Sequence, residues 1–205
     1  MIELCHGVWE WSVESREHRV ELTSHAVLGS GSWDCIDPIP LPPQFEAALM
    51  EMAPPGRILL TNSNHPRFSQ ELAARWGVSI LSEKLLVRVP ADSIWSKGGG
   101  SAVEEFQWPG GGWQVWKLPG GAEGELVLFD RARSLVVFGD AVVNVRGLEI
   151  LPDKYCQDAA LLRRSLGQWI DIIPAFQRAV FAHGPPLLDR ASEVIRRLLP
   201  SADLD

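Results

Sequence analysis

Hydrophobic and polar positions alternate in the first part of the chain, as they do in half-buried strands. Residues 7–13 and 17–29 follow this two-residue period. Another strand is predicted over residues 31–39, and the prolines of segment 38–43 prevent the ladder from continuing. The N-terminal region is therefore predicted to consist mainly of strands.

The spacing then changes to that of helices. Phe68, Leu72 and Trp76 recur at i, i+4 and i+8, and Gly77 follows as a stop signal. A wholly apolar run at residues 57–61 indicates a strand buried on both faces. Helices are predicted over residues 43–53, 66–77, 156–173 and 189–199, and further strands over 57–61, 78–81, 84–89, 113–118, 124–130, 134–140 and 178–182.

The order of these elements predicts the fold class. Strands outnumber helices and come in runs, with helices attached to each half, which favours an α+β fold with two sheets face to face and helices outside. We therefore predict a four-layer αββα sandwich. The Gly-rich segment 96–102 is too short to link domains, so residues 1–205 are predicted to form one domain of two similar halves that meet near 96–112.

Composition narrows the function classes. The formal net charge is −7, which does not favour nucleic-acid or anionic-membrane partners. The first residues have no positive n-region or apolar h-region, so no signal peptide is expected, and no apolar stretch is long enough to span a membrane. The scattered Cys5, Cys35 and Cys156 do not suggest a disulfide framework or zinc ribbon. A cytoplasmic protein with reduced thiols is expected. Most of the nine tryptophans are expected in the core, although an exposed stripe of them would predict a homodimer.

Five landmarks occur in a particular order along the chain. Ile36-Asp37 ends a strand, and "ILLT" leads into the polar loop "NSNHPR" at residues 62–67. The segments "LPGGAEGELVLFD", "SLVVFGDAVV" and "VFAHGPPL" follow. This succession resembles the metallo-β-lactamase superfamily over nearly the whole chain. The resemblance implies an αββα fold and a site of two divalent ions, usually zinc, held by His and Asp to activate a water for hydrolysis.

The ligand set that the resemblance implies is incomplete in this sequence. Of about seven expected ligands, Asp140 and His183 remain. Proline has no donor atom, glycine has no side chain, and arginine carries a fixed positive charge that repels a metal ion. A standard dinuclear zinc hydrolase is therefore not expected. Five of the family's ligand positions hold other residue types: Asn62, Asn64, Pro66, Arg67 and Gly121.

The loop 62–67 has two interpretations. In the first it is only a helix start, with Pro66 at the first helical position and Ser63 or Asn64 bonded to the local backbone. In the second it faces the pocket that the resemblance implies. His65 would then join Asp140 and His183 around at most one ion, provided that its ring points inward. Asn62, Asn64, Arg67 and Gly121 would line this pocket, with Asp140 neutralising Arg67.

Two functions follow from these interpretations. The sequence favours a protein without a cofactor that binds a small molecule or a partner and does not catalyse a reaction. The alternative is a metal-dependent hydrolase with one divalent ion, such as zinc, on Asp140, His183 and His65. The sequence does not identify a substrate, a ligand or an oligomeric state.

Overall fold

Two six-stranded sheets form the centre of the protein. A computed structural model describes residues 1–17, 19–88, 105–108 and 111–199. The first sheet has the order β1 (Ile2–Cys5), β2 (Val8–Ser15), β3 (Val20–Leu28), β4 (Trp33–Ile36), β5 (Pro55–Leu59), β6 (Ser79–Leu81). The second has the order β14 (Arg178–Phe181), β11 (Leu135–Phe138), β10 (Leu126–Asp130), β9 (Gln114–Lys117), β8 (Glu105–Gln107), β7 (Val87–Arg88).

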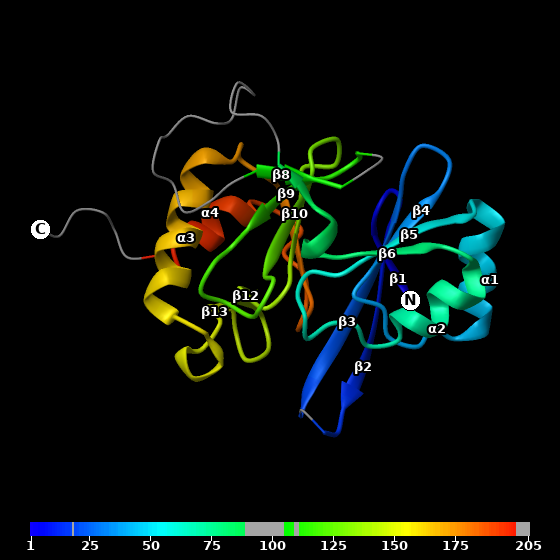
Figure 1. Cartoon of the computed structure of the whole chain (residues 1–205), viewed down its shortest axis with the longest axis horizontal. Helices are drawn as coiled ribbons and strands as arrows, with labels where there is room; N and C mark the ends of the chain where they lie inside the picture. The colour runs from blue at the N-terminus through cyan, green and yellow to red at the C-terminus, as the bar shows by residue number, and fades with distance from the viewer. Residues whose placement is uncertain (18, 89–104, 109–110, 200–205) are drawn as a thin grey trace, which may run out of the picture.

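Helices cover the outer face of each sheet (Figure 1). Helices α1 (Pro43–Met52) and α2 (Ser69–Trp76) lie on the first sheet, and α3 (Ala159–Ile172) and α4 (Ala191–Arg196) lie on the second. A short hairpin joins β12 (Val142–Val143) to β13 (Glu149–Ile150), and the 3₁₀ turns η1 (Glu83–Leu85) and η2 (Asp153–Tyr155) complete the described elements.

Three hydrophobic layers hold this arrangement together. Alternation along β10 places Leu126 and Leu128 toward the first sheet, whereas Val127 and Phe129 pack against α3. On β3, Val27 joins the layer between the sheets and Ala26 joins the layer under α1 and α2. The predicted αββα sandwich is therefore confirmed, because each sheet buries one face against a helix layer and the other against the opposite sheet.

Several predicted elements begin or end elsewhere. The helix predicted from residue 66 begins at Ser69, after Phe68 as N-cap, and has no side-chain cap. The strand predicted over 84–89 is wrong at its start, where η1 occupies Glu83–Leu85. Strands β1 and β8 and the β12–β13 hairpin were not predicted. Most of the segment 96–112, where the two halves are predicted to meet, lies outside the described residues.

The described tryptophans pack inside the protein. Seven of them are at most 8% exposed, and Trp76 is half-buried against Trp33. An exposed tryptophan stripe, the feature that would have predicted a homodimer, is therefore not found among the described residues. None of the described helices is long and apolar enough to cross a lipid bilayer.

Candidate metal site

The carboxyl ends of parallel strands bring distant segments of the chain together. Strand β4 is parallel to β5, and β11 is parallel to β14. Asp37 follows β4, and the loop with His65 follows β5. Asp140 and His183 lie two residues beyond the ends of β11 and β14. Crevices at the carboxyl ends of strands are the usual ligand sites of open α/β sheets, and here four polar loops meet at such a place.

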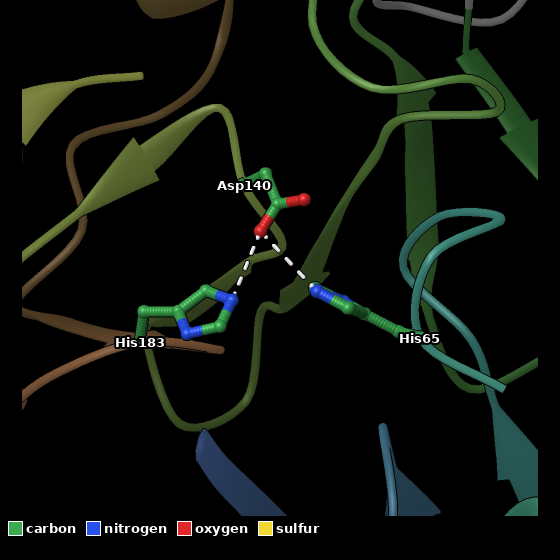
Figure 2. A group of neighbouring side chains, drawn as sticks. All are labelled: His65, Asp140 and His183. Atoms are coloured by element: carbon green, nitrogen blue, oxygen red, sulfur yellow. Dashed lines mark ion pairs between the residues drawn. The ribbon is translucent and has the colours of Figure 1, made fainter. Parts of the chain in front are cut away.

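His65, Asp140 and His183 converge on one point (Figure 2). The Nε2 atoms of His65 and His183 each lie 3.2 Å from the same oxygen of Asp140, Oδ1. The ligand atoms of the three residues lie within 4.8 Å of one another. Among the described residues this is the one His, Cys, Asp and Glu cluster with metal-ligand geometry. The ring of His65 therefore points into the site.

Each histidine of the cluster has a hydrogen-bond acceptor beside both of its ring nitrogens. Nδ1 of His65 lies 3.0 Å from Asp37 Oδ2, and Nδ1 of His183 lies 3.0 Å from the backbone carbonyl of Glu21. A carboxylate and a carbonyl can only accept, so each Nδ1 can keep its hydrogen there while an ion occupies Nε2. Both Nε2 atoms face Oδ1 of Asp140, which is also an acceptor, so without an ion a hydrogen on Nε2 is favoured as well. With Nδ1 as the donor, each Nε2 lone pair points toward Asp140. This is the orientation in which histidine binds a metal ion through Nε2.

Asp37 is the residue that holds His65 in place. It is 2% exposed and adopts a positive φ of 47°, a conformation that Asp tolerates better than most residues. Its Oδ1 accepts the backbone N–H of Thr61, and its Oδ2 accepts the Thr61 hydroxyl at 2.5 Å. The Thr61 hydroxyl oxygen lies 2.9 Å from His65 Nδ1. Asp37 and Thr61 were not predicted as site residues, although Asp37 was noted at a strand end.

The charges of the site favour a protonated His65 in the absence of a metal ion. Burial by itself would lower the pKa of His65, but the Asp37 charge and the hydrogen bonds to Asp140 and Asp37 outweigh burial and raise the pKa to about 9. Burial opposes ionisation of Asp140, yet hydrogen bonds from His183 and His65 lower its pKa. A proton and a cation therefore compete for the same Nε2 atom.

Two of the three ligand separations fit a divalent ion such as zinc, and all three are within 4.8 Å. Ligand atoms about 2.0–2.2 Å from a tetrahedral zinc ion lie roughly 3.3–3.5 Å apart, close to the two observed N–O distances of 3.2 Å. Two imidazoles and a carboxylate are a common donor set for catalytic zinc. The side chains of His183 and Asp140 are 15% and 13% exposed, so a further coordination position would face solvent.

The other proposed pocket residues have different surroundings. Asn62 is buried beside Asp140, whereas Asn64 is exposed and its backbone N–H binds the Asn62 side chain. A Cβ on Gly121 would lie 3.1 Å from Cγ of Glu125, so Glu125 fills the space beside this glycine. Glu125 was missed in the sequence. Its position directly before the apolar run of β10 was the one sign in the sequence that this acidic residue belongs to the site.

Arg67 joins the two sheets. Its guanidinium donates to the carbonyls of Thr23 at 2.8 Å, Asp37 at 2.9 Å and Ala182 at 3.3 Å. Thr23 belongs to β3, and Ala182 follows β14 in the other sheet. The sequence predicted that Asp140 would neutralise Arg67. The hydrogen bonds of the Arg67 guanidinium go to backbone carbonyls instead. The positive φ of Arg67, 39°, also explains why α2 starts later than predicted.

Arg67→Met is expected to destabilise the protein by about 2–4 kcal/mol, because partly buried carbonyls of both sheets lose a charged donor. Urea unfolding followed by circular dichroism measures this loss. Arg75→Met is the control: Arg75 is on a helix surface and pairs with Glu46, and this change should cost less than about 1 kcal/mol. Equal losses in the two variants would contradict a bridging role for Arg67.

A cavity of about 530 Å³ lies elsewhere in the molecule. Asp34, Arg57, Trp113, Asp130 and Arg133 line it, and none of the three clustered residues does. Asp34 pairs with Arg57, and Asp130 pairs with Arg133. Its charges are thus neutralised within the wall, so it is a weaker candidate than the His-Asp-His cluster.

Comparisons with known proteins identify other proteins of the same fold. No family model and no curated protein sequence matches the chain. Solved structures do match: a metallo-β-lactamase from Erythrobacter litoralis has a TM-score of 0.69 and 11% identity, covering 96% of this chain and 94% of that one. One from Pontibacter korlensis has a TM-score of 0.66 and 17% identity, covering 96% of each chain. An archaeal superfamily protein from Sulfolobus tokodaii has a TM-score of 0.62 and 17% identity, covering 98% and 91%.

Proposed function

We propose that this protein, which has the metallo-β-lactamase fold, is a hydrolase that uses one divalent metal ion, zinc or a similar ion, bound by His65, Asp140 and His183. The observation that carries the proposal is the pair of 3.2 Å contacts from two imidazole Nε2 atoms to a single oxygen of Asp140. Both Nδ1 atoms donate to acceptors, so both Nε2 atoms can coordinate. The sequence alone favoured a protein that binds a small molecule or a partner without catalysis. This geometry supports the alternative, a hydrolase with one metal ion.

The residues around the ion have separate tasks. When bound, the ion supplies a Lewis acid and a bound water whose pKa is lowered toward 7. Asp37 orients His65, and the Glu21 carbonyl orients His183. Hydrogen-bond acceptors of this kind orient the imidazole rings of metal-binding histidines and raise the metal affinity. The exposed side of His183 and Asp140 leaves room for water and for a substrate with an ester, amide, thioester or phosphodiester bond.

Hydrolysis of p-nitrophenyl esters and of bis(p-nitrophenyl) phosphate tests the proposal. Zinc-loaded protein should hydrolyse at least one of these compounds, and Asp140→Asn should reduce the rate by about 100-fold or more, because a neutral amide is a poor zinc ligand. His6→Ala, a change at the exposed surface, should leave the rate unchanged. Hydrolysis that is equal in wild type and Asp140→Asn would contradict the proposal.

A binding protein without catalysis is the second candidate. Asn62 and Arg67 occupy positions where the resemblance implies ligands, and both have satisfied hydrogen bonds with their neighbours. A site whose polar groups all have hydrogen-bond partners can stabilise the fold or bind a small molecule without a metal ion. Bound zinc with no hydrolysis of any compound in the panel would favour this candidate.

The unfolding free energy of the metal-free protein is expected to fall as the pH rises from about 6.5 to 9. The unfolded chain loses the His65 proton near its ordinary pKa of 6.5, whereas the folded protein keeps it to about 9. The stabilisation is therefore complete below pH 6.5 and is lost through pH 9, and it amounts to about 3 kcal/mol. Glu125 acts in the same direction, because burial and the Asp140 charge raise its pKa to about 8.

Urea unfolding at pH 6, 7.5 and 9 with a chelator present measures this dependence. In His65→Gln the unfolding free energy should fall less steeply with pH than in the wild type. The contribution of His65 is removed, and the contribution of Glu125 remains. Zinc affinity should rise over the same range, since the ion needs the Nε2 lone pair that the proton occupies. Parallel pH profiles for wild type and His65→Gln would contradict the assigned role of His65.

A further inference from the structure

The side chain of Asn62 lies between two buried carboxylates. Its amide nitrogen is 3.0 Å from Glu125 Oε2 and 3.1 Å from Asp140 Oδ2, and the residue is 4% exposed. Its amide oxygen accepts the backbone N–H of Asn64 at 2.9 Å. An amide oxygen can only accept and an NH₂ group can only donate, so this set of partners determines which end faces the carboxylates.

This contact divides the two oxygens of Asp140 between different partners. Oδ1 faces the imidazoles of His65 and His183, and Oδ2 accepts from Asn62. A carboxylate that bridges two metal ions needs one oxygen for each ion. Here the second oxygen already has a neutral donor, so Asp140 is arranged to bind one ion through Oδ1.

Glu125 is similarly occupied. Its Oε1 accepts the backbone N–H groups of Asp140 and Ala141, both at 2.9 Å, and its Oε2 accepts from Asn62. A Cβ on Gly139 would lie 2.8 Å from Glu125 Oε1, so the backbone packs tightly against this carboxylate. Two acidic side chains thus lie side by side, and the hydrogens of one amide group bind both of them.

We propose that Asn62 limits the site to a single metal ion by occupying, with its amide nitrogen, the position between Glu125 and Asp140 that a second ion would require. The inference rests on the proposed function, since it concerns the number of ions at the same site. It assigns Asn62 as a positioning residue that determines metal stoichiometry. It also gives Glu125 a role as the carboxylate that would ligate a second ion once the amide is removed.

Asn62→Asp tests this proposal, because it keeps the size of the side chain and replaces the amide donor with a third carboxylate. Titration with Mn²⁺ under electron paramagnetic resonance is the readout, since it counts bound ions and separates isolated from coupled ones. Wild type should bind about one ion, with the spectrum of an isolated Mn²⁺ even at excess metal. Asn62→Asp should bind about two, with the spectrum of a coupled pair.

Two further variants complete the experiment. Asn64→Asp adds the same charge on the exposed neighbour and should still bind about one ion. Asn62→Ala removes the amide without adding charge and should admit a second ion more weakly than Asn62→Asp. If Asn62→Asp does not fold, the number of ions bound by Asn62→Ala tests the proposal.

Each outcome has a definite meaning. One ion in wild type with a second ion in either Asn62 variant, and none added by Asn64→Asp, supports the proposal. A single ion in the wild type and in both Asn62 variants overturns the proposal and leaves the proposed function standing. A second ion at the site of the wild type overturns the proposal and also the single-ion form of the proposed function. No bound ion in wild type overturns both.

Discussion

His183→Ala is expected to lower the zinc affinity of the protein by at least about 100-fold. Loss of a residue that merely orients a metal ligand already costs about 10–100-fold in affinity, and His183 is proposed to be a ligand itself. After the change, His65 and Asp140 would remain as two ligands, which is fewer than the three of catalytic zinc sites. The Nε2 atom that lies 3.2 Å from Asp140 Oδ1 has no replacement among the neighbouring described side chains.

Competition with a fluorescent zinc chelator measures this affinity. His183 is partly exposed, so its truncation should reduce the unfolding free energy only slightly, and a loss of affinity will not reflect a loss of fold. His6→Ala is the matched control, because His6 is exposed and belongs to no described cluster of metal-ligand geometry. Equal zinc affinities for wild type and His183→Ala would show that the ion does not bind at the cluster.

Asp37→Ala is expected to reduce the unfolding free energy by about 3–5 kcal/mol, the usual loss when one partner of a buried ion pair is removed. Three donors lose their acceptor: the Thr61 N–H, the Thr61 hydroxyl and Nδ1 of His65. His65 is 3% exposed, so water cannot readily replace the carboxylate. Urea unfolding at pH 6.5 measures the loss, because wild-type His65 is protonated there.

Asp37→Asn separates stability from metal binding. The amide keeps the shape and one acceptor, so stability should fall less than in Asp37→Ala. Its NH₂ group, however, can donate to Nδ1 of His65, which would move the ring hydrogen to Nε2 and remove the lone pair that the ion needs. Zinc affinity should therefore fall by about 10–100-fold.

Asp34→Asn is the control for a buried acid on β4, the strand that Asp37 follows, because Asp34 pairs with Arg57 away from the site. It should lower stability without changing zinc affinity. Zinc affinity that is unchanged in Asp37→Asn would contradict the role of Asp37.

The arrangement of layers could be predicted from sequence because its signals are repetitive. Apolar runs such as 57–61, the helical spacing of Phe68, Leu72 and Trp76, and the alternation of strands and helices all reflect which faces are buried. Asp140 and His183 could be named through the resemblance, because "FGDA" and "AHGP" match two of its motif positions.

The loop 62–67 could not be predicted in the same way. It has no period, so the sequence does not reveal that His65 points toward Asp140 or that Arg67 adopts a positive φ and delays the helix. The partners Asp37 and Glu125 are far away in sequence, and their roles depend on contacts across sheets. The cross-strand pair of His25 with Glu10 also depends on a contact between residues distant in sequence.

Metal content after dialysis tests the central claim most directly. Tag-free wild-type protein is loaded with zinc, dialysed at pH 8 and analysed by inductively coupled plasma mass spectrometry. We predict about one zinc ion per chain, held by His65, Asp140 and His183. Protein that retains no zinc would contradict the account, and the convergence of the three side chains would then be an ion-pair network that stabilises the fold.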